Sequence, residues 1–574
     1  MLDRSIKFDN LKEMMKNSEE KFGEEVAFYR DGKGLEDSKK VTYKEFCYEI
    51  NSLGTALIEM GLKGKRIAII GENRYEWELS YLAVVTGTGT IVPLDKALPE
   101  NEIESLIIRS EVEAIIYSEK YDECMAKIQK QGNTKLKYFI SMDLEKNDFN
   151  KYSLKEITKK GKELLDGGNK EFLEAKINNE EMSIMLFTSG TTNQSKAVML
   201  SHKNICTNVK DIRNVFELDE TDRLLSFLPL HHTFECTVGF LYPLSIGGSI
   251  IFSKGVRHIA DELKNFKITA MICVPVVFEK MYDKLMKTIE DKGKMPTVKK
   301  GIKLSNCLLK VGIDIRKKLF KEIHDNLGGC LRVMVAGGAA LSPEKEKGFW
   351  DLGFNVLQGY GLTECSPLVA GNNDFYYKAA SCGMPIPNVE YKIDNPNDEG
   401  VGEIIVKGPN VMLGYYENEE ATKNVLKDGW FHTGDLGYVD DEEFLYISGR
   451  SKNMILTKNG ENIYPEEIEN ILNDDDLIEE SLVIGTSNGK DDVQVKAKIF
   501  PNIEAIKEYL GNKIPTKEEI SKILNEAVKK ANEKLPNFKH IKSFKIMDED
   551  FERTTTNKVK RFGKNVEDDE GKEK

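Results

Sequence analysis

The stretch LFTSGTTNQSKAVMLSH, residues 186–202, is the part of the sequence on which the fold assignment depends. A short apolar run leads into a row of small residues, and Lys196 follows on the same loop. The small residues are Thr188, Ser189, Gly190, Thr191 and Thr192. Small residues let the backbone approach a bulky anion, whose oxygens can accept hydrogen bonds from N–H groups and hydroxyls, and a lysine adds a charge that can reach a phosphate. We interpret the stretch as a phosphate-binding loop that follows a strand.

This loop differs from the P-loop of kinases and GTPases, because the spacing GxxxxGK[ST] is absent. An isolated cluster of Ser, Thr and Gly is more often a polar surface turn, and for this loop alone that alternative stays open. The remaining motifs of the chain decide between the two interpretations.

The length and charge of the chain limit the class of protein. A chain of 574 residues is too long for one core and indicates two to four domains or subdomains. Its 40% hydrophobic and 31% charged residues are typical of a globular protein that is not embedded in a membrane. The net charge of −13 argues against nucleic acid as a partner.

Cysteine usage and the N-terminal sequence indicate the compartment. The nine cysteines are scattered without a CxxC pair, which predicts free thiols in a reducing environment. Residues Met1–Asn10 lack the charged and apolar regions of a signal peptide. The longest uncharged run, Cys236–Ser253, contains glycines and Pro243, so buried core is the better interpretation than a membrane helix. We expect a cytoplasmic location, with peripheral contact at the inner membrane surface left open.

Residues 1–60 have a pattern typical of helices. From there to about residue 340, short strand patterns alternate with helical patterns. Such alternation predicts a mostly parallel sheet with helices on both faces. Residues 142–180 are polar, and we interpret them as a connecting excursion. The expected strands are Arg66–Gly71, Thr90–Pro93, Glu111–Tyr117, Lys137–Ser141, Arg223–Leu228, Gly248–Phe252, Ala270–Val274 and Leu331–Ala336.

The pattern of expected strands and helices changes twice toward the C-terminus. After Glu390 short strands and turns predict a small β-rich subdomain, and after Gly449 an α+β segment continues to about Lys560. The end, VEDDEGKEK, is charged and is expected to be disordered.

Residues 284–325 form a basic stretch, with twelve Lys or Arg against five acids and with apolar residues interleaved. Such a run is more often a solvated helical face. The more specific hypothesis is that this basic stretch contacts an anionic membrane surface.

Three motifs in the first 370 residues carry groups suited to nucleotide chemistry. LPLHHTFE at 228–235 places two histidines after an apolar strand, although one of them at least fits a core or turn position. VAGGAA at 335–340 ends a strand in glycines, which a flat ring can approach closely. GYGLTE at 359–364 offers an aromatic face, a hydroxyl and a carboxylate, which suit a purine, a phosphate and Mg²⁺.

Three further motifs follow in the last third of the chain. GWFHTGD at 429–435 ends in a carboxylate that suits a ribose diol, because the diol supplies two donors. GRSKNMI at 449–455 combines Arg450 and Lys452, and TTTNKVKR at 554–561 sets Lys558 among small polar residues. Taken alone, Lys558 would be one more solvated lysine.

In this order and spacing the motifs resemble those of the AMP-forming adenylating superfamily, and most of all the long-chain fatty acyl-CoA synthetases. The resemblance covers about residues 20–562, and the subfamily rests on LPLHHTFE, on VPVVFEKMYDKLM at 274–286 and on the basic insertion that follows.

The resemblance implies an α/β fold: a large N-terminal αβαβα domain with a β-rich subdomain, and a small mobile α+β C-terminal domain. The implied bounds are 1–448 for the large domain, with the subdomain at about 385–448, then 449–452 for a hinge, 453–562 for the C-terminal lid and 563–574 for a charged tail. Such enzymes use ATP and Mg²⁺ to convert a carboxylic acid to an acyl-adenylate, and then transfer the acyl group to coenzyme A. A homodimer is left open.

Residue roles also follow from the resemblance. The loop Thr188–Thr192 with Lys196 would hold pyrophosphate, Thr363 would contact the α-phosphate, and Glu364 would hold Mg²⁺. Asp435 and Arg450 would fix the ribose, Lys452 would stand at the hinge, and His232 would lie at the mouth of the acyl pocket. Lys558 would bridge the attacking carboxylate and the α-phosphate, where a cation between two anions reduces their repulsion. The adenine would lie against Gly338, Ala339, Gly359, Tyr360 and Gly361.

The sequence departs from the family pattern at two places. The family pattern has a glycine and a proline in the segment before the lysine, and this chain has Asn193, Gln194 and Ser195 there. A loop with less glycine is stiffer, so we expect its contacts with phosphate to differ. Asn557 replaces the usual glycine before Lys558, and asparagine tolerates a left-handed backbone.

Several alternatives remain at this point. The substrate could be an aryl or shorter-chain acid in place of a long-chain fatty acid, and the acceptor a carrier-protein thiol in place of coenzyme A. A protein of another class, a nucleotide- or lipid-binding pseudoenzyme on the same fold, is opposed by the presence of Glu364 and Lys558.

Overall fold

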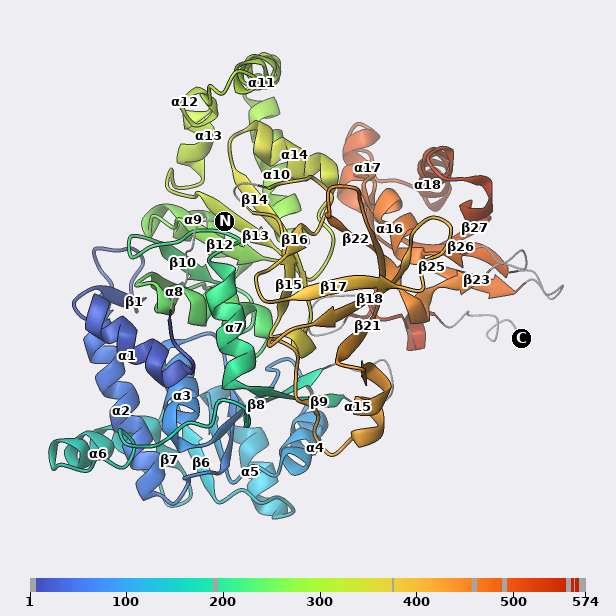
Figure 1. Cartoon of the computed structure of the whole chain (residues 1–574). Helices are drawn as coiled ribbons and strands as arrows, with labels where there is room; N and C mark the ends of the chain where they lie inside the picture. The colour runs from blue at the N-terminus through green and yellow to red at the C-terminus, as the bar shows by residue number, and fades with distance from the viewer. Residues whose placement is uncertain are drawn as a thin grey trace. The chain divides into compact units, whose positions relative to one another are not determined.

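The computed structural model describes residues 7–188, 195–373, 376–456, 462–487, 493–553, 559–561 and 563–566. The chain divides into two compact units, Met1–Tyr391 with Val406–Phe431, and Lys392–Ile405 with His432–Lys574. It passes from one unit to the other within strands β17 (Glu390–Asp394), β18 (Gly402–Lys407) and β21 (Trp430–Val439). Figure 1 shows the course of the chain.

An eight-stranded sheet in the first unit has the order β19-β9-β8-β4-β3-β5-β6-β7. The strands from β8 to β7 pair in parallel, whereas β8, β9 and β19 form an antiparallel end. Their bounds are β3 Arg66–Ile70, β4 Thr90–Pro93, β5 Ala114–Tyr117, β6 Tyr138–Ser141, β7 Tyr152–Ser153, β8 Met182–Thr188, β9 Lys196–Ser201 and β19 Gly414–Tyr415.

A nine-stranded sheet in the same unit has the order β16-β15-β14-β13-β12-β10-β11-β1-β2. Its centre is parallel, and both edges are antiparallel. The strands are β1 Val26–Arg30, β2 Lys39–Thr42, β10 Arg223–Ser226, β11 Ser249–Phe252, β12 Ala270–Cys273, β13 Val333–Ala336, β14 Asn355–Gly361, β15 Leu368–Gly371 and β16 Met384–Pro385.

Helices connect these strands and lie on the faces of the sheets (Figure 1). Hydrogen-bonded capping boxes begin α2 and α7, where Thr42 pairs with Glu45 and Ser201 with Asn204. The helices are α1 Leu11–Phe22, α2 Tyr43–Glu59, α3 Tyr75–Ala83, α4 Glu100–Ser110, α5 Asp122–Gln131, α6 Leu154–Asp166, α7 His202–Ile212, α8 Tyr242–Ser245, α9 Ile259–Asn265, α10 Pro275–Asp291, α11 Met295–Leu309, α12 Arg316–Leu319, α13 Lys321–Asn326, α14 Pro343–Asp351 and α15 Glu419–Val425.

The interior of the eight-stranded sheet is built from large apolar residues, many of them β-branched. Ile70, Val92, Ile115 and Tyr117 are fully buried and pack in one cluster with Ile107 of α4. Each such side chain contributes about 1.5–3 kcal/mol on burial. A sheet covered on both faces explains why these strands read as continuous apolar runs in the sequence.

The second unit contains an antiparallel pair of β21 with β22 (Leu445–Arg450) and a three-stranded sheet of order β25-β26-β27. Around Ile468, Leu524 and Ile499 it has a core of its own. The further elements are β23 Ile455–Leu456, β24 Asn462–Ile463, α16 Pro465–Asn473, β25 Ile478–Ser487, β26 Val493–Pro501, α17 Ile503–Tyr509, α18 Lys517–Glu533 and β27 Ser543–Ile546.

The predicted fold class is confirmed, and so are the eight predicted strands, each within a few residues. One local prediction is wrong: residues 1–60, expected to be helical, contain the strand pair β1–β2 between two helices. The connecting excursion 142–180 contains α6, and Asn565, directly before the segment 566–574 that is expected to be disordered, is buried. The Asn565 side chain donates to the carbonyls of Glu552 and Lys560, at 2.8 Å each, which orders residues 563–566.

The structure also bears on the remaining expectations about organisation. All nine cysteines are free thiols. Among the described residues, no helix is both long and apolar enough to cross a membrane. The predicted hinge at 449–452 lies inside the second unit and not at one of its boundaries, so it stays a prediction.

Candidate active site

The stem of the predicted phosphate loop is an antiparallel pair of strands. Thr188 at the end of β8 lies opposite Lys196 at the start of β9, and the Thr188 hydroxyl donates to the Lys196 carbonyl at 3.4 Å. Both residues are partly exposed. Ser189, Gly190, Thr191 and Thr192 lie outside the described residues. The strand before the loop is therefore confirmed, and the phosphate contacts of these four residues stay predictions.

Arg109 of α4 holds the returning side of this stem. Its guanidinium donates to the Ser195 carbonyl at 2.6 Å and to the Ser195 hydroxyl at 3.1 Å, and it lies 5.3 Å from the ring centroid of Phe187 on the outgoing side. One planar cation thus ties both sides of the stem together. Sequence reasoning missed Arg109, because nothing in α4 marks the one arginine that reaches Ser195.

Replacing Arg109 by alanine should weaken the use of ATP. Hydrogen bonds with one charged partner contribute about 1.5–3 kcal/mol each, so we expect the KM for ATP to rise by about tenfold or more. Arg109→Lys, which retains the charge but not the two-pronged contact, should fall between wild type and alanine. A KM for ATP that Arg109→Ala leaves unchanged would show that the stem needs no such support.

The turn that carries Glu364 is fixed by buried asparagines. Glu364 lies in the 3-10 turn Thr363–Cys365 after β14. Asn208 of α7 donates to the carbonyls of Cys365 and Leu368, at 3.1 and 3.0 Å, and Asn410 donates to the same two carbonyls. At Gly361 a Cβ would lie 2.2 Å from the Pro367 carbonyl oxygen, so only glycine fits this close approach.

Tyr415 contacts both the predicted metal ligand Glu364 and the loop lysine Lys196. Its hydroxyl donates to Glu364 Oε1 at 2.9 Å, and the ammonium of Lys196 lies 4.6 Å from its ring centroid. Burial and the neighbouring carboxylate raise the pKa of Tyr415 well above its usual range, so the phenol keeps its proton and remains the donor. The structure therefore brings Lys196 and Glu364, which are 168 positions apart in the sequence, to the same tyrosine.

Glu364 has the properties of a magnesium ligand. It is a partly exposed carboxylate that contacts the same tyrosine as Lys196 of the predicted phosphate loop, and Mg²⁺ prefers one or two carboxylate oxygens together with substrate phosphates. The Tyr415 hydroxyl holds Oε1 of the side chain, which stays partly exposed. The residues present thus fit the group that the sequence implies.

The residues predicted to face the adenine come from neighbouring strands. Gly338 and Ala339 are exposed at the end of β13, and Gly359, Tyr360 and Gly361 end the adjacent β14. Tyr360 is only 8% exposed, so most of its ring is already covered by protein. A Cβ at Gly337 would lie 2.9 Å from the Phe234 ring, which shows that the VAGGAA and LPLHHTFE motifs are in contact.

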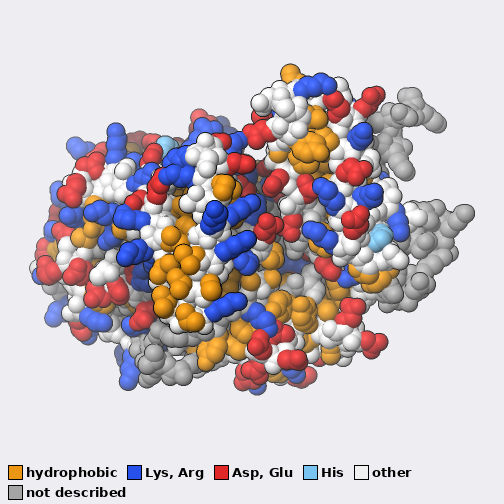
Figure 2. Space-filling model, turned by 90° about the horizontal axis from the view of Figure 1, so that it is seen from above, with side chains coloured by type: hydrophobic (Ala, Val, Ile, Leu, Met, Phe, Trp, Pro, Cys, Tyr) orange, Lys and Arg blue, Asp and Glu red, His pale blue; other side chains and the backbone are white. Residues whose placement is uncertain are grey.

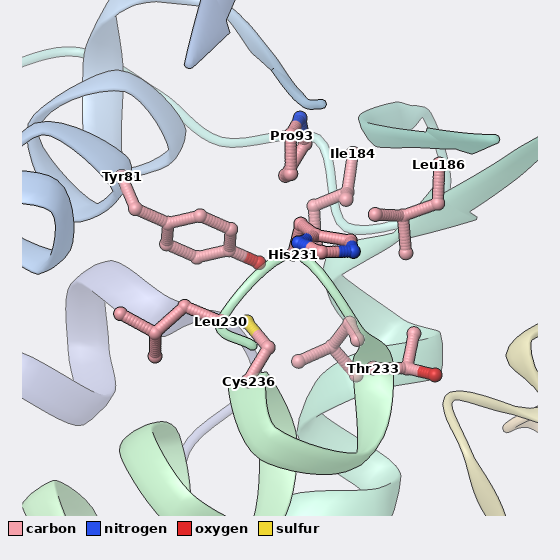
Figure 3. A pocket seen from close by; sticks show the side chains of 9 residues that line it. Tyr81, Pro93, Ile184, Leu186, Leu230, His231, Thr233 and Cys236 are labelled. Carbon is pink, nitrogen blue, oxygen red and sulfur yellow. The ribbon is translucent and has the colours of Figure 1, made fainter. Parts of the chain in front are cut away.

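His232 lies beside a second histidine and a carboxylate. The ring centroids of His231 and His232 are 4.1 Å apart, and His231 Nε2 lies 3.3 Å from Asp95 Oδ1. His231 also lines a small pocket, in which Tyr81, Leu186 and Cys236 are among its neighbours (Figure 3). Glu235, three residues after His232, is fully buried, and its burial raises the pKa of the carboxyl to about 8.

The residues predicted to hold the ribose belong to the second unit. Asp435 on β21 lies opposite Arg450 on β22, and Arg450 Nε is 3.0 Å from Asp435 Oδ1. The side chain of Asp435 is 8% exposed and that of Arg450 is 47% exposed. Partial desolvation of the Lys452 ammonium, together with Arg450 and Arg561, lowers the pKa of Lys452 to about 8. Lys558 lies outside the described residues, so its predicted role is neither supported nor opposed by geometry.

Comparison with known families gives the class of protein. Residues 15–416 match the model of the AMP-binding enzyme family, and residues 452–566 match the model of the AMP-binding enzyme C-terminal domain. The chain belongs to the AMP-binding enzyme family, as the motifs predicted.

Individual relatives agree with this class. Long-chain-fatty-acid–CoA ligase 5 of Rattus norvegicus is 32% identical over 468 residues, which are 75% of this chain and 67% of that protein. Long-chain-fatty-acid–CoA ligase FadD15 of Mycobacterium bovis is 27% identical over 554 residues, with 91% and 90% covered. The crystal structure of the anthranilate CoA ligase AuaEII in complex with anthranoyl-AMP has a TM-score of 0.76 at 20% identity, with 96% of each chain covered, and supports the fold alone.

Proposed function

We propose that this protein activates a long-chain fatty acid with ATP, forms an acyl-adenylate, and transfers the acyl group to coenzyme A. The observation that carries the proposal is the contact of Lys196 and Glu364 with one tyrosine, because it joins the predicted phosphate lysine to the predicted magnesium carboxylate. The curated relatives named as long-chain-fatty-acid–CoA ligases support the choice of acid and thiol.

Each residue has a definable task in such a reaction. Lys196 would hold the pyrophosphate end of ATP, and Glu364 would hold Mg²⁺, which supplies charge neutralisation at the phosphates when bound. Asp435 would accept hydrogen bonds from the ribose hydroxyls, and Arg450 would orient them as a donor. Lys558 would bring the attacking carboxylate to the α-phosphate, where it offsets the repulsion between two anions.

The experiment that tests this function is a screen of carboxylic acids by chain length. Pyrophosphate release with ATP should rise toward the long-chain acids, and coenzyme A should convert the adenylate to acyl-CoA. A preference for aryl or short-chain acids would change the substrate and keep the reaction class. Nucleotide binding without pyrophosphate release from any acid would favour the pseudoenzyme.

A hinge at residues 449–452 is part of the proposal, since two half-reactions require two arrangements of one lid. Lys452 lies within the 3-10 turn Ser451–Asn453. The φ typical of a 3-10 turn is near the value that proline fixes. Lys452→Pro should therefore preserve this turn and oppose rotation. We expect the variant to retain pyrophosphate release and lose acyl-CoA formation.

The control for the hinge variant is Lys452→Ala, which removes the ammonium but leaves the backbone free to rotate. The two half-reactions are measured separately, by pyrophosphate release and by acyl-CoA formation. Wild-type rates of both in Lys452→Pro would move the pivot elsewhere.

We also propose that the basic stretch contacts anionic lipid through α11 and the following α12. Leu304, Val311 and Ile313 are 53%, 70% and 51% exposed on this surface. Figure 2 shows hydrophobic side chains gathered among Lys and Arg side chains on the face viewed from above. Within the described residues no ion pair is seen for six exposed lysines of this segment, which distinguishes them from a solvated face of paired charges. These lysines are Lys299, Lys300, Lys303, Lys310, Lys317 and Lys318.

Vesicle sedimentation tests this surface. Reversal of Lys299, Lys300 and Lys303 to glutamate should reduce binding to phosphatidylglycerol vesicles by about 100-fold or more, since each basic residue contributes about 1 kcal/mol. The matched control reverses Lys159, Lys160 and Lys162 on α6. Equal losses in both variants, or binding to phosphatidylcholine that salt does not weaken, would contradict the proposal.

A further inference from the structure

Two histidines and a carboxylate from distant segments meet at the edge of the first unit's interior. Asp95 follows β4, and His231 and His232 lie in the loop after β10. One potential ligand atom of each residue lies within 4.8 Å of those of the other two. All three residues are partly exposed, whereas the Nε2 atoms of His231 and His232 are buried.

The distance within the cluster is that of two ligands sharing one metal ion. His231 Nε2 and Asp95 Oδ1 are 3.3 Å apart, whereas a charge-assisted hydrogen bond contracts to about 2.7–2.9 Å. Zinc bonds to nitrogen and oxygen of about 2.0–2.2 Å in tetrahedral geometry place neighbouring ligands roughly 3.4 Å apart. The observed separation therefore matches a zinc edge, although ion pairs of this protein such as Arg66 with Glu111, at 3.5 Å, reach similar distances.

The loop that carries both histidines is fixed by backbone contacts. The His232 amide donates to the Pro229 carbonyl at 3.1 Å, and the His232 carbonyl accepts from the Cys236 amide at 2.9 Å. On the other side the Ala97 amide donates to Asp95 Oδ1 at 2.8 Å. Apolar neighbours of His231, among them Leu186 and Pro93, hold its ring from one side (Figure 3). The ligands are thus positioned by the fold.

A second cluster of similar composition serves as a comparison. Asp394, Glu403 and His432 also have ligand atoms within 4.8 Å of one another. There, however, Glu403 Oε2 is 2.8 Å from His432 Nδ1, and Glu403 Oε1 accepts from the Gly434 amide at 2.9 Å. A metal would have to break this short contact between Glu403 and His432, whereas the corresponding separation of His231 and Asp95 is already 3.3 Å, so the second cluster is the weaker candidate.

We propose that Asp95, His231 and His232 form a binding site for a zinc-class divalent ion, with the fourth position open to water. Imidazole nitrogen favours such ions over Mg²⁺, so the magnesium needed at Glu364 would not fill this site. Three protein ligands and an open position are the arrangement of zinc sites that exchange their fourth ligand.

A bound ion would fix the position of the His232 ring. The effect on activity that follows from this rests on the proposed function. If His232 lies at the mouth of the acyl pocket, a bound zinc ion should inhibit acid-dependent pyrophosphate release. The inhibition should disappear when His231 is replaced by glutamine.

Cobalt binding to the metal-free full chain tests the site independently of activity. Co²⁺ in a tetrahedral nitrogen–oxygen site gives visible absorption, and Zn²⁺ should displace it. His231→Gln keeps a hydrogen-bonding side chain of similar length but removes the imidazole ligand, and Asp95→Asn removes the charge. We expect either change to weaken Co²⁺ binding by about 10- to 100-fold.

Two further variants make the outcome decisive. Lys96 interacts electrostatically with Asp95, so Lys96→Met should tighten Co²⁺ binding, which a folding defect could not do. His432→Ala, in the second cluster, should leave the absorption unchanged. No visible absorption, absorption that survives His231→Gln, or absorption lost in His432→Ala would overturn the proposal. Absorption as expected in a chain that releases no pyrophosphate would leave the metal site standing and refute the proposed function.

Discussion

Lys558→Ala is expected to reduce acyl-adenylate formation by about 100- to 1000-fold, while leaving thioester formation from pre-made adenylate largely intact. The reason is that adenylation brings a carboxylate against the α-phosphate, and a cation between them stabilises the charged transition state. The second half-reaction starts from an uncharged acyl carbonyl and has no such need. Pyrophosphate release measures the first step, and acyl-CoA formation from supplied acyl-adenylate measures the second.

The matched control is Lys560→Ala, two residues further on, whose amide donates to the Glu552 carbonyl at 2.9 Å. That backbone contact survives the substitution, so Lys560→Ala should keep both half-reactions, whereas a general loss of folding in this segment would lower the activity of both variants. Equal loss of both half-reactions in Lys558→Ala would contradict the role given to this lysine.

Glu364→Gln should raise the Mg²⁺ concentration required for half-maximal rate by about 10- to 100-fold, because a neutral amide is a poor ligand for a hard cation. Tyr415→Phe removes the donor to Glu364 Oε1 and keeps the ring beside Lys196. Its effect should be smaller, about fivefold, as expected for one hydrogen bond. The measurement is rate against Mg²⁺ at saturating ATP.

A double variant sharpens this test. If the tyrosine acts through the carboxylate, Tyr415→Phe should add nothing once Glu364 is already glutamine. Glu419→Gln on the exposed start of α15 is the control carboxylate. An unchanged Mg²⁺ dependence in Glu364→Gln would refute the assignment of the metal ligand.

The fold was predictable where burial leaves a continuous apolar signal. Strand β4 was predicted at Thr90–Pro93, its observed bounds, because the strand is covered on both faces. Helix α6 was missed because it buries few of its residues, and Gly161 among them lies so close to α2 that a Cβ would be 1.8 Å from the Ser52 carbonyl oxygen. Such a contact depends on chain packing that a local pattern does not record.

The same distinction separates the site residues that were predicted from those that were missed. Lys196 and Glu364 stand in motifs whose composition indicates phosphate and metal chemistry. Tyr415 acquires its place only because β19 returns to pair with β9, where Tyr415 lies opposite Val198. Arg109 and Asp95 likewise contact the loops at Ser195 and His231 across the sheet, and neither carries a signal in its own segment.

The central claim is that this chain joins an acid to coenzyme A through an adenylate. It is tested most directly by incubating the purified protein with ATP, Mg²⁺ and palmitate, first without and then with coenzyme A. The account predicts pyrophosphate release that depends on palmitate, followed by palmitoyl-CoA and AMP in equal amounts when coenzyme A is added. ATP binding with no palmitate-dependent pyrophosphate, or pyrophosphate release without any acyl-CoA, would contradict it.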